Sequence, residues 1–202
     1  MGLAGSLREP DEVIVRFVAI PESILLRGLS ASSALLVGPE GPKYMLYGAE
    51  VAALVGPVLL QSELIRAQVK NAIDLEAAQE GQLHFVDPGY TAWYAEAGWM
   101  LTGERRDYSV RRGVFSGIDP QRSVLAGGWG AFELAARYSF TDLLDPVLGG
   151  DEGRVASVGL AWYADPRAKL VLEGLRIEED DREEHEEATA VQLRAQLYFT
   201  VP

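Results

Sequence analysis

One segment constrains the fold of this chain more than any other, the stretch GGWGAFELAARYSFTD at Gly127–Asp142. From Trp129 onward its residues alternate between apolar and polar, which is the pattern of a β-strand with two different faces. The apolar face holds Phe132, Leu134, Ala136, Tyr138 and Phe140, and the polar face holds Glu133, Arg137, Ser139 and Thr141. A soluble β-sandwich rarely places a glutamate and an arginine in the middle of such a strand. An outer-membrane barrel does so routinely, because lipid surrounds it and its lumen is polar.

The same alternation recurs along the chain, most clearly at 90–102, 154–163 and 190–199. Gly56-Pro57 and Ala164-Asp165-Pro166-Arg167 are short turn sequences, and each separates two strand-like segments, as in a hairpin. The pattern predicts about eight strands, which begin near Val13, Lys43, Val58, Tyr90, Trp129, Arg154, Lys169 and Ala190. Two segments are less regular. The first, 21–42, is predicted to be a loop, although Leu25, Leu26 and Leu35 are also compatible with a strand or a short helix. The second, 63–80, is compatible with a strand or with a helix.

The order of turns and loops predicts the topology. If the two tight turns lie at one end of a meander, the longer connections at 71–89, 143–153 and 178–187 all lie at the other end, as in an outer-membrane barrel. The connection 104–128 is too long for this plan unless it folds back as an extra pair of strands around 108–115. We therefore predict one domain over residues 1–202, an all-β, antiparallel, up-and-down transmembrane β-barrel with about eight strands.

Composition excludes several other classes of protein. A net charge of −12 argues against a nucleic-acid partner, because phosphate binding needs clustered lysine and arginine. The chain has no cysteine, and its two histidines are about a hundred residues apart, so we predict no disulfide and no metal site. An apolar run of about 18 residues, as a spanning helix requires, is absent. Met1–Leu7 lacks a charged start followed by an apolar stretch, and we expect no signal peptide in this chain.

Charged residues on the polar faces of the predicted strands are the candidate functional residues. They are Glu50, Glu63, Glu96, Glu133, Arg137, Arg176 and Arg194. Such residues either line a pore, where opposed charges set a transverse field and select ions, or pair across neighbouring strands and neutralise a crowded interior. Because glutamates recur on almost every strand, no pair of acids stands out for catalysis, and we predict neither an enzymatic activity nor a cofactor.

Two further groups of side chains have two interpretations each. The basic cluster of the long connection either attracts anions at a channel mouth or is a solvated loop paired with Glu104 and Asp107; it comprises Arg105, Arg106, Arg111, Arg112 and Arg122. A set of aromatic residues forms either girdles at the membrane interfaces or an ordinary core. This set comprises Trp93, Trp99, Trp129, Trp162, Tyr138 and Phe199.

Four stretches together resemble a known family: AEVAALVGPVLLQSELIRAQV at 49–69, WYAEAGWMLTGERRDYSVRRGVFSGIDP at 93–120, GGWGAFELAARYSFTDL at 127–143 and VQLRAQLYF at 191–199. The combination of LTGE with a downstream WGAFELAARYS is the most specific part. The chain resembles the C-terminal half of the phosphate-selective porin O and P family of Gram-negative outer membranes, and the resemblance covers about residues 49–199.

The resemblance implies a passive, trimeric porin that contacts outer-membrane lipid and passes small anions such as phosphate or polyphosphate. It also implies a barrel of about 16 strands, of which this chain supplies half. Two alternatives stay open. The interior of an eight-stranded barrel is filled by side chains, which is compatible with a truncated or structural membrane barrel that conducts nothing. Strands with one apolar face are also compatible with a soluble β-barrel that binds a small apolar ligand.

Overall fold

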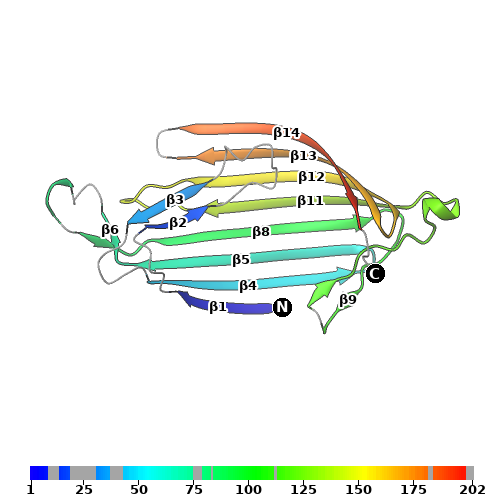
Figure 1. Ribbon diagram of the computed structural model, residues 1–202, viewed down its shortest axis with the longest axis horizontal. Coiled ribbons are helices and arrows are strands. Elements are labelled where there is room, and N and C mark those ends of the chain that lie inside the picture. Colours follow the sequence, from blue (N-terminus) through cyan, green and yellow to red (C-terminus); the bar gives the residue numbers. More distant parts are fainter. Residues whose placement is uncertain are drawn as a thin grey trace.

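The computed structural model of the protein describes residues 1–8, 14–18, 31–36, 43–74, 79–82, 84–111, 113–181 and 184–198. These residues are dominated by one antiparallel sheet of eight strands (Figure 1). In spatial order the strands are β1 (Gly2–Arg8), β4 (Lys43–Val55), β5 (Val58–Lys70), β8 (Gly89–Met100), β11 (Ala131–Asp142), β12 (Glu152–Asp165), β13 (Ala168–Asp180) and β14 (His185–Leu197). The predicted all-β antiparallel fold is confirmed. β1 and β14 are the two edges of this sheet, so its closure into a barrel stays a prediction.

Both predicted hairpins are present. β4 and β5 are joined by Gly56 and Pro57, and Gly56 has the positive φ, 60°, that the first position of a tight hairpin turn needs. β12 and β13 are joined by a turn of the same length, with Asp165 opposite Ala168. Because β5 runs to Lys70, the helix considered for 63–80 is wrong over residues 63–70.

Three two-stranded sheets complete the described fold. They are β2 (Ile14–Val18) with β3 (Ser32–Leu36), β6 (Ala72–Ile73) with β7 (Phe85–Val86), and β9 (Tyr108–Ser109) with β10 (Val114–Phe115). β9 and β10 confirm that the long connection folds back as a strand pair, and a short helix, η2 (Val124–Ala126), follows them.

Two predictions for the first forty residues are wrong. The strand predicted near Val13 lies outside the main sheet and pairs with β3, which itself occupies part of the segment predicted as loop. Its expected place in the main sheet is taken by β1, whose sequence GLAGSLR has two glycines and no β-branched residue. The β-propensity of such a segment is weak, and its pairing with β4 makes it a strand. The turn signals at 37–42 lie outside the described residues.

The connections gather at two ends of the sheet (Figure 1). The β4–β5 and β12–β13 turns lie at one end, which we call the turn end, together with the connection 101–130 that carries β9, β10 and η2. The connection 143–151 and the described residues of the connections 71–88 and 181–184 lie at the opposite end, which we call the loop end. This distribution agrees with the predicted topology. Among the described residues, no helix combines the length and the apolar content that crossing a membrane requires.

The two faces of the sheet differ in polarity and in burial. Directly paired residues of an antiparallel sheet point to the same side, and the register places Leu134 opposite Leu160 on one face and Glu133 opposite Ala161 on the other. We call these the apolar face and the polar face. Leu134 is 41% exposed and Leu193 is 72% exposed, whereas Glu133 is 5% exposed. The apolar side chains are therefore exposed on one face of the sheet, and Glu133 on the other face is buried.

Two segments cover parts of the polar face. At the loop end, Phe17 of β2 contacts the rings of Tyr44 and Tyr90, with centroids 5.6 and 5.3 Å apart. At the turn end, Ile118 of the connection 101–130 is 3% exposed. Its buried cluster also holds Met100, Ala131, Ala161, Tyr163 and Val171. Inserted chain thus covers both ends of the polar face, while large side chains of the apolar face stay exposed.

Candidate functional site

The register brings most of the predicted charged residues onto the polar face. Glu50 lies opposite Glu63, and Glu96 lies opposite Arg137. Six of the seven predicted residues share this face by register and by alternation within each strand; they are Glu50, Glu63, Glu96, Glu133, Arg137 and Arg194. The polar face is therefore the candidate functional site.

Arg176 is the exception, because it lies on the apolar face of β13. It is opposite Thr189 of β14, and its guanidinium lies 2.9 Å from carboxylate oxygens of Glu178 and Glu187. The sequence of β13 carries charges on both faces near the loop end. Without the register it is therefore ambiguous which residues of β13 point to which face of the sheet. The prediction that Arg176 shares a face with the other six residues is therefore wrong.

From β4 to β14, the strands place cations on only one part of the polar face. The neighbouring strands β4, β5 and β8 each place one charged residue there, and all three are acids: Glu50, Glu63 and Glu96. The strands β11, β13 and β14 each add one cation, Arg137, Lys169 and Arg194, beside the acids Glu133, Glu173, Glu179 and Glu186 of the same strands. Sequence reasoning missed Lys169, because only its position opposite Gln196 of the clearly alternating β14 reveals which face it occupies.

The connection 101–130 adds a fourth cation to this face. Arg106 donates hydrogen bonds of 2.8 and 2.7 Å to the two carboxylate oxygens of Glu133, and the Tyr163 hydroxyl donates one of 2.6 Å to the same carboxylate. Burial tends to lower the pKa of the Arg106 guanidinium, but the hydrogen bonds and charge of Glu133 outweigh burial and raise the pKa above its ordinary value. Arg106 is therefore a fixed positive charge at the turn end.

The rest of the predicted basic cluster does not join Arg106. Arg105 and Arg111 are exposed on the connection, and Arg112 lies outside the described residues. Glu104 is buried, but it accepts hydrogen bonds from the Thr102 hydroxyl and from a backbone N–H of the connection. It thus anchors the start of the connection. Neither interpretation of the basic cluster describes Arg106, which contacts a strand residue 27 positions away.

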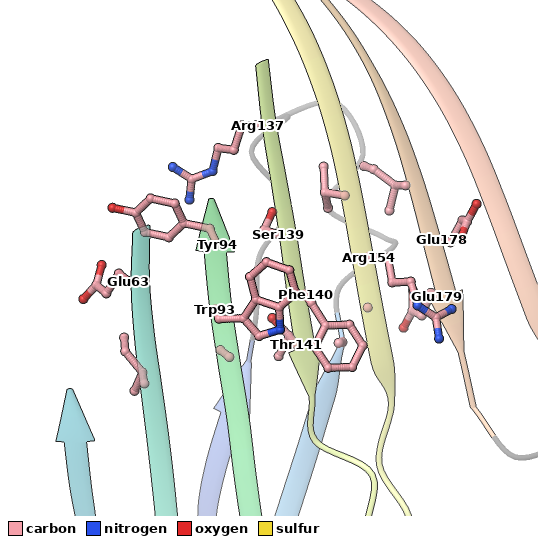
Figure 2. Close-up of a pocket in the computed structure, with 16 residues that line it drawn as sticks. Glu63, Trp93, Tyr94, Arg137, Ser139, Phe140, Thr141, Arg154, Glu178 and Glu179 are labelled. Atoms are coloured by element: carbon pink, nitrogen blue, oxygen red, sulfur yellow. The ribbon is translucent and has the colours of Figure 1, made fainter. Parts of the chain in front are cut away.

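Arg137 occupies the middle of the polar face on β11. Figure 2 shows its guanidinium beside the ring of Tyr94, and the guanidinium carbon lies 3.8 Å from the ring centroid. It also forms an ion pair of 3.2 Å with Glu96, while the Tyr94 hydroxyl accepts a hydrogen bond of 2.6 Å from Gln61. A cation over an aromatic face and beside a carboxylate is held by two independent attractions. The side chain is therefore fixed in orientation although it is partly exposed.

These charges surround one groove of about 380 Å³ on the polar face. Its charged lining consists of Arg106, Arg137, Lys169 and Arg194 with Glu96, Glu133 and Glu173. Arg194 lies 3.7 Å from Glu173, so each arginine of the groove has an acidic neighbour. Within the part of the chain that the structure describes, no group of three or more acidic or histidine side chains is placed to hold a metal ion.

Aromatic side chains form two groups on the apolar face. Toward the loop end, the ring of Trp93 lies 5.6 Å from that of Tyr138 and 6.3 Å from that of Phe140. Toward the turn end, Phe132 stacks on Trp162 at 6.4 Å. Phe132 and Phe140 belong to the same strand and are separated by about 26 Å. With the strand tilt of a barrel, about 35 to 45°, this separation corresponds to a height of about 20 Å, which is within the apolar band of an outer-membrane barrel, about 25 Å tall.

The exposure of these aromatic residues tests the interpretation that they form an ordinary core. Trp93, Trp99, Trp129 and Tyr138 are all exposed, and Trp162 donates a hydrogen bond of 2.8 Å to the Trp129 carbonyl at the turn end. A core position is therefore wrong for them. Phe199 lies outside the described residues.

Comparison with known proteins identifies what this chain is similar to. The family model for phosphate-selective porin O and P matches residues 31–199. An uncharacterized protein of Caulobacter vibrioides is 42% identical over 78 residues, which are 38% of this chain and 14% of that protein. Porin O of Pseudomonas aeruginosa is 24% identical over 134 residues, which are 62% of this chain and 28% of that protein. The chain thus spans less than a third of the length of either relative.

Proposed function

The chain belongs to the phosphate-selective porin O and P family, and on that premise we propose that its sheet forms the wall of an outer-membrane channel. Small anions, such as phosphate or polyphosphate, diffuse passively along the polar face, and the apolar face contacts membrane lipid. The family is one of channels rather than enzymes, so no catalytic step and no cofactor are involved. One barrel domain over residues 1–202, a trimeric assembly and a Gram-negative outer-membrane location are parts of the same proposal.

The inverted polarity of the sheet is the observation that carries this proposal. Large apolar side chains such as Leu172 and Leu193 are exposed on one face, and a contiguous apolar surface of this kind is unfavourable in water. In hydrocarbon it is favourable, because antiparallel strands satisfy each other's backbone groups and only apolar side chains meet lipid. The charges of Glu133 and Arg137 need water or partners, and a lumen supplies water on that side.

The distribution of charge supports passage of anions. The strands β4, β5 and β8 place only acids on the polar face, whereas β11, β13 and β14 also place cations there. An anion is drawn to the part of the face that carries Arg137, Lys169 and Arg194. The groove beside these cations is the proposed path of the anion.

A non-conducting membrane barrel is the second candidate, and one observation favours it. The polar face is covered by the β2–β3 hairpin at the loop end and by the connection 101–130 at the turn end. If these segments fill the lumen, the chain inserts in the membrane and passes nothing.

Conductance in a planar bilayer distinguishes the two candidates. We expect the purified 202-residue chain to produce stepwise current increases, with a reversal potential in a KCl gradient that shows a preference for chloride. The same detergent without protein is the control. If protease protection shows insertion but many insertions give no current, the chain is a barrel without a pore.

Replacing Arg194 tests the proposed path. Arg194→Leu removes a cation from the polar face, so the ratio of anion to cation permeability is expected to fall by about half or more. Arg176→Leu is the matched control, because it removes the same charge from the apolar face of the neighbouring strand and is expected to leave the ratio unchanged. The reversal potentials of the two variants in a KCl gradient give the ratio of anion to cation permeability. Equal shifts in both variants contradict the proposed path.

A further inference from the structure

Three neighbouring strands carry charge on the apolar face only near the loop end. On this face, the charged residues of β4, β5 and β8 are Lys43, Arg66 and Lys70, and all of them are cations. Lys43 is directly opposite Lys70, and Arg66 lies four residues before Lys70 on β5. We call these three residues the basic patch. At the turn end, the same face of β4 and β5 ends on the uncharged pair Val55 and Val58.

The basic patch begins where the aromatic residues near the loop end stop. Arg66 is directly opposite Tyr47, and this pair is two residues nearer the loop end than Leu64, which is opposite Trp93. Tyr47, Leu64 and Trp93 are all exposed. Aromatic residues with lysine or arginine just beyond them are typical of the boundary between the hydrocarbon of a membrane and its headgroups. The basic patch therefore lies at the level of the headgroups if lipid covers the apolar face.

The side chain of Arg66 points away from the apolar residues. Its Nη2 lies 3.7 Å from the position that a Cβ atom would take at Gly89. Gly89 is two residues nearer the loop end than Thr91, which is directly opposite Arg66. The guanidinium thus extends toward the loop end, on the side of Lys70. Long cationic side chains at a membrane boundary extend in this way, with the aliphatic part over apolar surface and the charge near the headgroups.

The positive charge of the basic patch is only partly compensated by the protein. Lys70 forms an ion pair of 2.6 Å with Asp87. Among the described residues, no acid forms an ion pair with Lys43 or Arg66. Arg176 on the same face of β13, by contrast, lies between two acids. Like charges directly opposite one another are destabilising in a sheet, so the pairing of Lys43 with Lys70 favours an anion beside them.

We propose that the basic patch binds the phosphate group of an anionic lipid from outside the wall. This inference rests on the proposed function, because it needs lipid on the apolar face. A planar guanidinium such as that of Arg66 can hold two phosphate oxygens, and Lys43 adds a second uncompensated charge. The acyl chains of the same lipid lie against Leu64 and Trp93. A free anion matches the charges but not this apolar surface, so a lipid fits both parts of the site.

Quenching of Trp93 fluorescence tests this inference. Trp93 becomes the only tryptophan after Trp99→Phe, Trp129→Phe and Trp162→Phe. The chain is reconstituted into phosphatidylcholine vesicles with increasing fractions of a lipid that has brominated acyl chains, either phosphatidic acid or phosphatidylcholine. We expect brominated phosphatidic acid to reach half-maximal quenching at a mole fraction roughly five- to tenfold lower, because each cation near an anionic headgroup strengthens binding by about fivefold.

Arg66→Gln, in the same background, removes the uncompensated cation nearest to Trp93. We expect the preference for phosphatidic acid to fall by about fivefold, with quenching by brominated phosphatidylcholine unchanged. Arg176→Gln is the matched control, because it removes the same charge from the same face and the same end of the sheet, at a position already paired with acids. It is expected to leave the preference unchanged. An equal loss in both variants reflects total charge rather than a site and overturns the inference.

The remaining outcomes separate this inference from the proposed function. Equal quenching of the parent chain by the two brominated lipids overturns the inference and leaves the contact with lipid standing. No quenching by either lipid, with the β-sheet intact by circular dichroism, overturns both. Excess inorganic phosphate, compared with KCl of the same ionic strength, is expected to leave the preference unchanged. If phosphate alone abolishes the preference, the basic patch is a site for free anions and the assignment to a lipid is wrong.

Discussion

Val191→Arg is expected to lower the free energy of unfolding in phospholipid vesicles by roughly 2 to 4 kcal/mol, the cost of an arginine near the bilayer midplane on the lipid side of a barrel. Val191 lies on the apolar face. It is paired with Gly174 of β13, which is paired with Val158 of β12, and Val158 lies four residues before Trp162. These three paired residues therefore lie at a height between the two aromatic groups. Val191 is 70% exposed, so the same substitution in a water-soluble protein changes stability by less than about 0.5 kcal/mol.

Gln192→Arg is the matched control for this substitution. Gln192 is the next residue of β14 and points to the polar face, where its side-chain amide donates a 2.7 Å hydrogen bond to Glu173. An arginine at this position meets the Glu173 carboxylate and water, and we expect a change of less than about 0.5 kcal/mol. Urea titrations of both variants and the parent chain in the same vesicles give the comparison. Equal small effects at the two positions mean that the apolar face does not contact lipid.

The polarity of each strand was predictable from sequence, because alternation is a local property. Phe132, Glu133 and Leu134 are consecutive residues of one strand, so any extended conformation separates the acid from its apolar neighbours. The same reasoning failed for Arg176 and missed Lys169. Both lie in β13, where the charges alternate less cleanly, and only pairing with β14 fixes which face each residue occupies.

The long-range contacts of the polar face were not predictable in this way. Arg106 reaches Glu133 from the connection, and Phe17 reaches Tyr90 from a separate hairpin. No periodicity links such residues, since the contact depends on how a connection folds over a sheet built from distant segments. β1 escaped prediction for a related reason, because its strand conformation comes from its partner β4. Sequence thus predicted the strands of the main sheet and the polarity of most of their residues, but not the long-range contacts that cover its polar face.

The contact between Arg106 and Glu133 is the second feature expected to have a large effect. Only 18% of the Arg106 side chain and 7% of the Glu133 side chain are exposed. Removing one partner of a buried pair leaves an uncompensated charge, which typically costs about 3 to 5 kcal/mol. We therefore expect Arg106→Ala and Glu133→Ala each to destabilise the protein by about 3 kcal/mol. Glu63→Ala is the control on the same face, and we expect it to be neutral or stabilising because Glu63 faces Glu50.

The double variant shows whether the contact between Arg106 and Glu133 holds the connection 101–130 against the sheet. If the two side chains stabilise mainly each other, Arg106→Ala combined with Glu133→Ala costs about as much as either single change, and the coupling energy is about 2 kcal/mol or more. The single variants also free the connection, so trypsin is expected to cut after Arg105 and Arg111 faster than in the parent chain. Strictly additive losses, with unchanged cleavage, mean that the connection is held by Ile118 and its apolar cluster instead.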